Sequence, residues 1–115
     1  MAKDETVYLG HMLDRARKII AKVEGKTRAD FDHDENLRLA LAHLIQTIGE
    51  AARKVSPGMR SAHPDIPWKR IMGMRHKIVH DYMEIDEDVV WIVATERLRT
   101  LVKQLAPLVP EEPIS

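Results

Sequence analysis

Cysteine is absent from this 115-residue sequence, which excludes disulfides, thiolate nucleophiles and most zinc sites. Aromatic residues are few, with two Trp, two Tyr and one Phe, so an aromatic platform that stacks on unpaired bases is not expected. No apolar run approaches the roughly 18 residues that a membrane span requires. The charged residues that open the chain do not resemble a signal peptide. We expect a soluble, cytoplasmic protein.

The sequence also lacks an excess of charge of either sign, because eighteen basic residues balance eighteen acidic ones. No global field then attracts nucleic acid, and any such affinity has to come from local clusters of cations. A chain of this length forms one domain with one modest core. We place this domain at residues 1–106 and assign residues 107–115 to a C-terminal tail.

Apolar residues recur at spacings of three and four, the pattern of amphipathic helices. The first such stripe extends from Leu9 to Val23, and Gly25 is placed to end that helix. Residues 26–33 are a connection with room for one short helical turn. A second helix covers residues 35–55, with Asp34 as its N-cap, and residues 56–58 (Ser-Pro-Gly) stop it.

A third helix is predicted after a loop at residues 59–65. Pro67 suits its first turn, and its apolar positions continue to Val79. The fourth helix begins near Glu87, is capped by Asp86 and ends before Pro107. Because no segment alternates in the manner of a strand, the sequence predicts an all-α fold, an antiparallel four-helix bundle. The wide apolar stripes favour a homodimer, whose interface would extend the core.

One segment departs from the charge balance. Residues 66–80 contain no acidic side chain, and they carry four cations and two histidines, namely Lys69, Arg70, Arg75, Lys77, His76 and His80. One reading is a solvated helix face. The other is a phosphate-binding surface, because the guanidinium fork of Arg matches phosphate and His changes charge near neutral pH.

Residues 73–82, GMRHKIVHDY, resemble the signature of the HEPN superfamily in its HepT-like branch. That signature is an Arg, four residues, a His, one residue and a Tyr, matched here by Arg75, His80 and Tyr82. Residues 44–52 are similar to the second helix of that branch, residues 66–68 to the start of its third helix, and residues 86–91 to the start of its last. At His76 the branch most often carries Asn.

The resemblance implies a metal-independent ribonuclease that requires no cofactor. His80 would transfer protons to and from the ribose and phosphate oxygens, and Arg75 would stabilise the charge that builds on the phosphate. The remaining candidates are the RNA-binding residues Lys69, Arg70, His76 and Lys77 and the supporting residues Asp81 and Glu50. Asp81 could raise the pKa of His80 or fix its tautomer.

The resemblance also implies a partner. HepT-like proteins form toxin–antitoxin pairs with a small nucleotidyltransferase antitoxin, which resembles enzymes that transfer AMP onto hydroxyl groups. Tyr82 would then be the acceptor, because a bulky negative group beside the site would repel RNA. The alternative is that Tyr82 packs in the fold or binds phosphate through its hydroxyl group.

Helix geometry restricts how the site can be assembled. Residues five apart on an unbroken helix point about 140° away from each other, so Arg75 and His80 would not converge. Either the helix ends before His80, or the Arg75 side chain bends round, or a second chain completes the site. We hypothesise a symmetric groove in which Arg75 and His80 of both chains of a dimer take part.

Other readings remain open. HEPN-type proteins also occur as non-catalytic, substrate-binding companions of nucleotidyltransferases, and a structural dimer with an incidental basic face is a third possibility. His76 and His80 have a spacing that suits a metal, but no third ligand follows, and we predict no metal site. Gly49 and Gly73 are predicted inside helices, where close helix packing would explain them.

Overall fold

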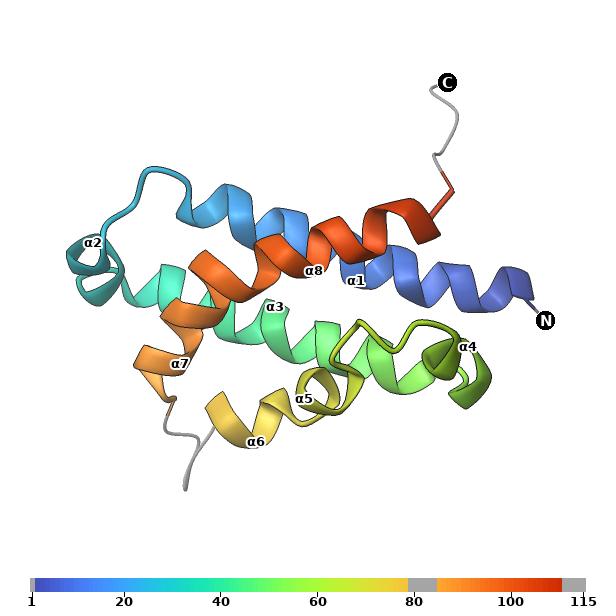
Figure 1. Cartoon of the computed structure of the whole chain (residues 1–115). Coiled ribbons are helices and arrows are strands. Elements are labelled where there is room, and N and C mark those ends of the chain that lie inside the picture. The colour runs from blue at the N-terminus through green and yellow to red at the C-terminus, as the bar shows by residue number, and fades with distance from the viewer. Residues whose placement is uncertain (1, 79–84, 111–115) are drawn as a thin grey trace.

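The computed structural model describes residues 2–78 and 85–110, with side chains described from residue 6 onward. The described residues form helices and contain no β-strand, which confirms the all-α prediction (Figure 1). In chain order the elements are α1 (Ala2–Val23), α2 (Arg28–Asp32), α3 (Glu35–Lys54), α4 (Pro57–Ala62), α5 (Trp68–Met72), α6 (Met74–Ile78), α7 (Glu87–Ile92), the π-helical turn η2 (Val93–Arg97), α8 (Leu98–Leu105) and the 3-10 turn η3 (Ala106–Leu108).

The two longest helices, α1 and α3, form the centre of the molecule. They run in opposite directions, and the α7–α8 arm packs across α1 (Figure 1). The predicted stripe from Leu9 to Val23 belongs to the same core cluster as Leu41 and Ile45 of α3, with Ile20 partly buried against it. Gly25 follows α1 with a φ of 74°, a left-handed conformation that suits glycine at a helix end.

The ends of α3 agree with the prediction. The Asp34 side chain accepts a hydrogen bond from the Leu37 backbone N–H at 3.0 Å, and α3 ends at Lys54. The loop predicted at residues 59–65 is wrong in its first part, because α4 extends to Ala62. The Ser56 side chain caps α4 and Pro57 occupies its first turn, and these two residue types are the strongest local signals for starting a helix.

The third predicted helix is divided, and the prediction of one continuous helix is wrong. The helix α5 ends at Met72, Gly73 stands at the junction, and α6 starts at Met74. A Cβ atom on Gly49 of α3 would lie 2.9 Å from the Ile71 carbonyl oxygen, so the α5 backbone approaches α3 closely. This confirms the packing role of Gly49. Arg53 then donates a hydrogen bond to the Met72 carbonyl at 2.9 Å, which removes that oxygen from the helical ladder.

The C-terminal arm is capped as predicted, since the Asp86 side chain accepts from the Val89 N–H at 3.1 Å. Within the arm, η2 interrupts the regular helix, and the Leu98 N–H bonds to the Val93 carbonyl. A wider turn lets residues at successive spacings of four stay on the core side, and Ala94 and Leu98 are both buried. Leu108 and Val109 also pack against the core. The boundary at residue 106 stays a prediction.

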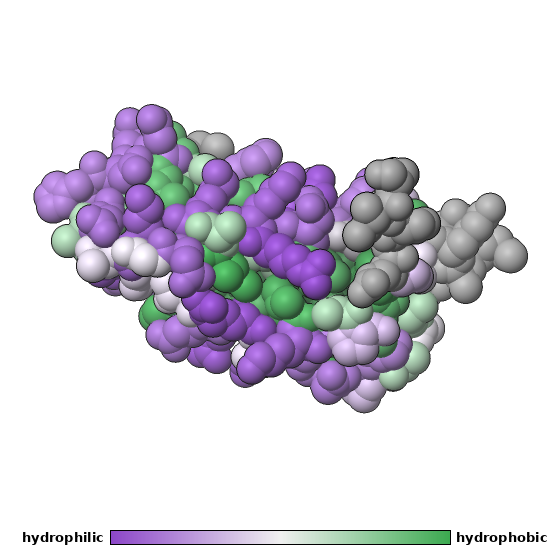
Figure 2. Space-filling view, turned by 90° about the horizontal axis from the view of Figure 1, so that it is seen from above, coloured by the Kyte–Doolittle hydropathy of each residue, from purple (hydrophilic) through white to green (hydrophobic). Residues whose placement is uncertain are grey.

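The surface of the described part of the chain is mixed. Over α1 and α8, a strip of hydrophobic surface lies between hydrophilic side chains (Figure 2). The large hydrophobic side chains with high exposure are Val7, Leu39 and Ile92, and they lie on three different helices. Within the described ranges, no helix is both long and apolar enough to cross a membrane. The four-helix description and the homodimer stay predictions.

Candidate nucleic-acid interface

The cations of the basic segment are exposed on α5 and α6. Apolar side chains anchor these short helices in the core, where Trp68, Ile71 and Ile78 are buried. The Trp68 indole N–H also donates to the His63 carbonyl at 3.0 Å. The buried apolar residues of this segment thus anchor it in the core, and its charged residues point to solvent. The exposed side chains are Lys69, Arg70, Arg75, His76 and Lys77.

Only part of the predicted catalytic motif falls within the described residues. Arg75 lies on α6, whereas His80, Asp81 and Tyr82 lie outside the described residues. The roles predicted for these three residues, and the convergence of Arg75 with His80, stay predictions. Glu50 is exposed on α3. Its supporting role also stays a prediction.

The residues on either side of 79–84 lie close together. The Asp86 backbone N–H donates to the Ile78 carbonyl at 2.7 Å. Ile78, which precedes residues 79–84, is fully buried in the core, and Ile85, which follows them, packs against the core. A backbone hydrogen bond therefore joins the end of α6 to the residue that precedes α7.

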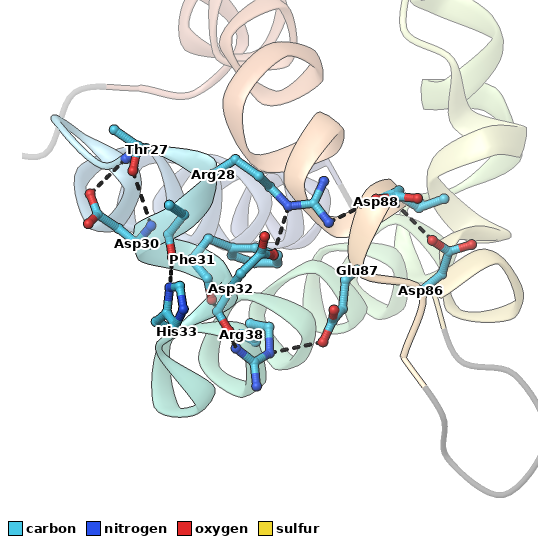
Figure 3. Close-up of polar contacts among 12 residues, drawn as sticks. Thr27, Arg28, Asp30, Phe31, Asp32, His33, Arg38, Asp86, Glu87 and Asp88 are labelled. Atoms are coloured by element: carbon cyan, nitrogen blue, oxygen red, sulfur yellow. Dashed lines mark hydrogen bonds and ion pairs between the residues drawn. The ribbon is translucent and has the colours of Figure 1, made fainter.

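The start of α7 is tied to α3 and to the segment that contains α2 by Arg38 (Figure 3). The Arg38 Nε atom lies 3.0 Å from a Glu87 carboxylate oxygen. Its Nη1 atom donates to the Phe31 carbonyl at 3.0 Å and to the Asp32 carbonyl. The side chain of Arg38 is 19% exposed. One guanidinium group thus joins three elements of the fold.

A second arginine reinforces this connection. Arg28 of α2 contacts Asp32 at 2.9 Å and the first-turn residue Asp88 of α7 at 2.8 Å (Figure 3). Hydrogen bonds to Asp32, and then to Asp88, raise the pKa of Arg28 above its ordinary value. The buried Phe31 ring packs beside Trp91 with a centroid separation of 5.1 Å. These contacts set where the chain resumes after residues 79–84.

A groove of about 830 Å³ lies between the α5–α6 pair and the α7–α8 arm. We call it the interhelical groove. Its apolar lining is supplied by Ile71, Met74, Val89, Ile92, Val93, Leu98 and Leu101. Its charged lining consists of Arg70, Lys77, Arg97, Asp65 and Glu96.

The interhelical groove divides the predicted RNA-binding residues. Arg70 and Lys77 line it, and Lys69 and His76 do not. Arg97, which the sequence analysis missed, adds a cation from the opposite wall. No local pattern distinguishes Arg97 from Arg99, and only the packing of the C-terminal arm against α5 and α6 brings it to the groove.

Metal ligands do not gather in the described part of the fold. No group of three or more His, Asp or Glu side chains there is arranged to hold a metal ion. Of the candidate pair, His76 is exposed on α6, and His80 lies outside the described residues. The prediction that the protein binds no metal stays a prediction.

These observations define a class of protein, namely a small all-α domain in which two cationic helices without acidic residues lie beside a groove. A family model described as "Ribonuclease HepT-like" matches residues 12–108, which include the motif from Arg75 to Tyr82. The chain belongs to the HepT-like ribonuclease family, and the resemblance inferred from the motif is confirmed.

Curated relatives agree with this assignment. A protein of Caldanaerobacter subterraneus subsp. tengcongensis, named "Putative RNase", is 31% identical over 105 residues, which are 91% of this chain and 94% of the relative. A "Putative RNase" of Methanocaldococcus jannaschii is 26% identical over 103 residues, covering 90% and 94%. The "Probable ribonuclease HepT" of Thermococcus cleftensis is 32% identical over 72 residues, covering 63% and 66%. No solved structure matches.

Proposed function

We propose that this chain is a metal-independent endoribonuclease of the HEPN type. The observation that carries the proposal is the family match over residues 12–108, because it includes the whole motif of Arg75, His80 and Tyr82. The exposed position of Arg75 on α6 supports it, since a phosphate in solution can reach that side chain.

In the proposed reaction, His80 accepts the proton of a ribose 2′-hydroxyl group. The resulting oxygen attacks the adjacent phosphorus, the bond to the 5′-oxygen breaks, and an imidazolium group gives that oxygen a proton. The products are a 2′,3′-cyclic phosphate and a free 5′-hydroxyl group. An unperturbed His pKa near 6.5 suits both proton transfers. Arg75 stabilises the negative charge on the phosphorus oxygens, an effect of about 3–4 kcal/mol in comparable sites.

The other exposed side chains of the basic segment bind the neighbouring phosphates. Lys69, Arg70, His76 and Lys77 are exposed around Arg75 and have no acidic residue between them in sequence. In a protein with no net charge, such a cluster supplies the local attraction for RNA. RNA binding should therefore weaken as the salt concentration rises.

The decisive experiment incubates RNA in EDTA with the wild type, His80→Ala, Arg75→Ala and the control Arg99→Ala. Arg99 is an exposed arginine outside the motif, paired with Glu24 at 3.8 Å. We expect cleavage by the wild type and the control, and a loss on the order of 100-fold or more in each motif variant. No cleavage by the wild type would favour the non-catalytic, substrate-binding module instead. Inhibition by EDTA would contradict the metal-independent reaction.

We further propose that the protein acts as the toxin of a toxin–antitoxin pair, whose nucleotidyltransferase antitoxin transfers AMP to Tyr82. The tyrosine oxygen would attack the α-phosphorus of ATP, pyrophosphate would leave, and the phenolic proton would pass to solvent. The added negative charge beside the site would repel the RNA phosphates.

Mass spectrometry tests this modification after incubation with the partner and ATP. We expect an AMP adduct on the wild-type chain, no adduct on Tyr82→Phe, and loss of ribonuclease activity in proportion to the adduct. An unmodified Tyr82 under conditions in which the partner is active would contradict the proposal.

A further inference from the structure

We propose that the interhelical groove binds one unpaired nucleotide of the RNA substrate, with Arg97 as a phosphate ligand. This inference rests on the proposed ribonuclease function and extends it, because it defines the substrate as single-stranded at this position. Met74 and Lys77 of α6 line the groove, and Arg75 lies between them in the sequence without lining it, so the groove and Arg75 share this short helix.

The first support is charge. Arg70 and Lys77 extend from the α5–α6 wall, and Arg97 extends from η2 on the other wall. Among the described residues none of these three forms an ion pair, whereas the nearby Arg99 contacts Glu24 at 3.8 Å and the Thr95 carbonyl at 3.3 Å. Cations that line one groove from two walls, with no ion pair among the described residues, suit an anion between them, and arginine matches phosphate especially well.

The carboxylates of the groove do not cancel this charge. The lining contains two carboxylates, Asp65 and Glu96, and three cations, so its net charge is one positive charge. That charge matches one phosphodiester group. Near Asp65, the Gln104 side chain donates to the Asp65 carbonyl at 2.8 Å and joins the two walls.

The second support is the apolar floor. Ile92 is 42% exposed in the groove, and Met74 is partly buried there. A base can lie against such aliphatic and thioether groups, although none of the described residues that line the groove is aromatic. A volume of about 830 Å³ falls within the range of sites that enclose small ligands. An A-form duplex keeps its base faces stacked inside the helix, so only an unpaired base could reach this floor.

A second copy of the chain fits the groove less well. Stable protein interfaces bury about 800 Å² on each partner around an apolar centre. Ile92 is the strongly exposed large hydrophobic side chain of the described groove, and the others, Val7 and Leu39, lie on α1 and α3. An apolar floor between cations that form no ion pair within the described residues matches a nucleotide better than a helix.

The test measures binding rather than cleavage. Fluorescence anisotropy would follow a labelled 2′-O-methyl RNA oligonucleotide of mixed sequence, which lacks the attacking hydroxyl group, as a single strand and as a duplex. The variants are Arg97→Ala, the matched control Arg99→Ala from the same arm, and Ile92→Ser. Circular dichroism confirms that each variant keeps its helices.

We expect Arg97→Ala to weaken single-strand binding about 3-fold to 10-fold and to reduce the slope of log K against log salt by about 0.7, as the loss of one phosphate contact predicts. Arg99→Ala should leave both unchanged. Ile92→Ser should weaken single-strand binding without changing the salt slope, and the duplex should bind more weakly to the wild type.

Equal effects of Arg97→Ala and Arg99→Ala would overturn the proposal. So would an Ile92→Ser protein that binds RNA normally but changes its sedimentation mass, because the groove would then be a protein interface. The two proposals fail separately. RNA binding that depends on Arg97, without any cleavage, would refute the ribonuclease proposal and support the groove proposal. RNA cleavage that is unaffected by Arg97→Ala would support the ribonuclease proposal and refute the groove proposal.

Discussion

Glycine positions show how single residues determine where the cations lie. Gly49 lies inside α3 directly under α5, and its missing side chain lets the Ile71 carbonyl approach within 2.9 Å of the place of a Cβ atom. Arg53, one turn further along α3, then reaches the Met72 carbonyl. The distance between α5 and α3, and with it the position of Arg70, therefore depends on the absence of a side chain at residue 49.

Replacing Gly49 with Ala should destabilise the protein. The new methyl group meets backbone rather than a flexible side chain, and such overpacking costs about 1–3 kcal/mol. This cost exceeds the gain of up to about 1 kcal/mol that Ala brings to a helix. Gly10→Ala is the matched control, since its Cβ would lie 3.8 Å from a Val109 methyl group. It should raise the free energy of unfolding by about 0.5–1 kcal/mol.

Urea denaturation of both glycine variants measures the difference. The unfolding midpoint should fall for Gly49→Ala and rise for Gly10→Ala, with similar slopes for the two transitions. Stabilisation of similar size in both variants would show that α5 does not approach α3 as closely as described.

Among the elements, the start of α7 has the clearest mechanical role. Arg38 and Arg28 hold it through Glu87 and Asp88, and it follows directly after the segment that contains His80. Exposed ion pairs contribute little to stability, but Arg38 is mostly buried and also bonds two carbonyl groups. We therefore expect Arg38 to act as a positioning residue for the proposed reaction.

Arg38→Ala should lower kcat of RNA cleavage about tenfold, which corresponds to roughly 1.4 kcal/mol, a typical loss for one charge-assisted hydrogen bond. KM should stay unchanged, because the cations that bind RNA are not altered. Arg38→Lys should recover part of kcat, since it restores the charge but not the fork. Steady-state kinetics well below the unfolding temperature measure both constants.

The control for this element is again Arg99→Ala, which removes the ion pair of α8 with Glu24 and leaves the contacts of Arg38 with Glu87 intact. A merely structural role for Arg38 would lower the unfolding temperature and leave kcat of the folded protein intact. That result would contradict the positioning role.

At the scale of the whole molecule, the question is how one chain supplies both an acid and a base. A single motif contains one His80, and in-line cleavage requires proton transfer at both ends of the reacting phosphate. The predicted homodimer would provide the second histidine. In the described residues the exposed large hydrophobic side chains lie on three different helices.

We expect the specific activity to fall on dilution in parallel with the dimer fraction. Sedimentation velocity would give that fraction, and cleavage of a labelled RNA would give the activity at the same concentrations. Circular dichroism should show that the helices persist in the monomer. A monomer with full specific activity would contradict the shared site.

The sequence alone determined the helices whose signals are local. The apolar periodicity of residues 9–23 and 37–55, together with Asp34 and Asp86 as caps, predicted α1, α3 and the start of α7. It also determined the family, because the motif at Arg75, His80 and Tyr82 has a fixed spacing in the chain. Ser56 both follows α3 and caps α4, so the stop signal at residues 56–58 is also the start of the next helix.

Only the tertiary structure decided the division between α5 and α6, the π-helical turn and the place of Arg97. Each depends on contacts between residues far apart in the sequence, such as Gly49 with Ile71 or Arg53 with Met72. Periodicity and caps report what one segment prefers by itself. They contain no information on how closely another helix will approach, and that approach determines which cations share the groove.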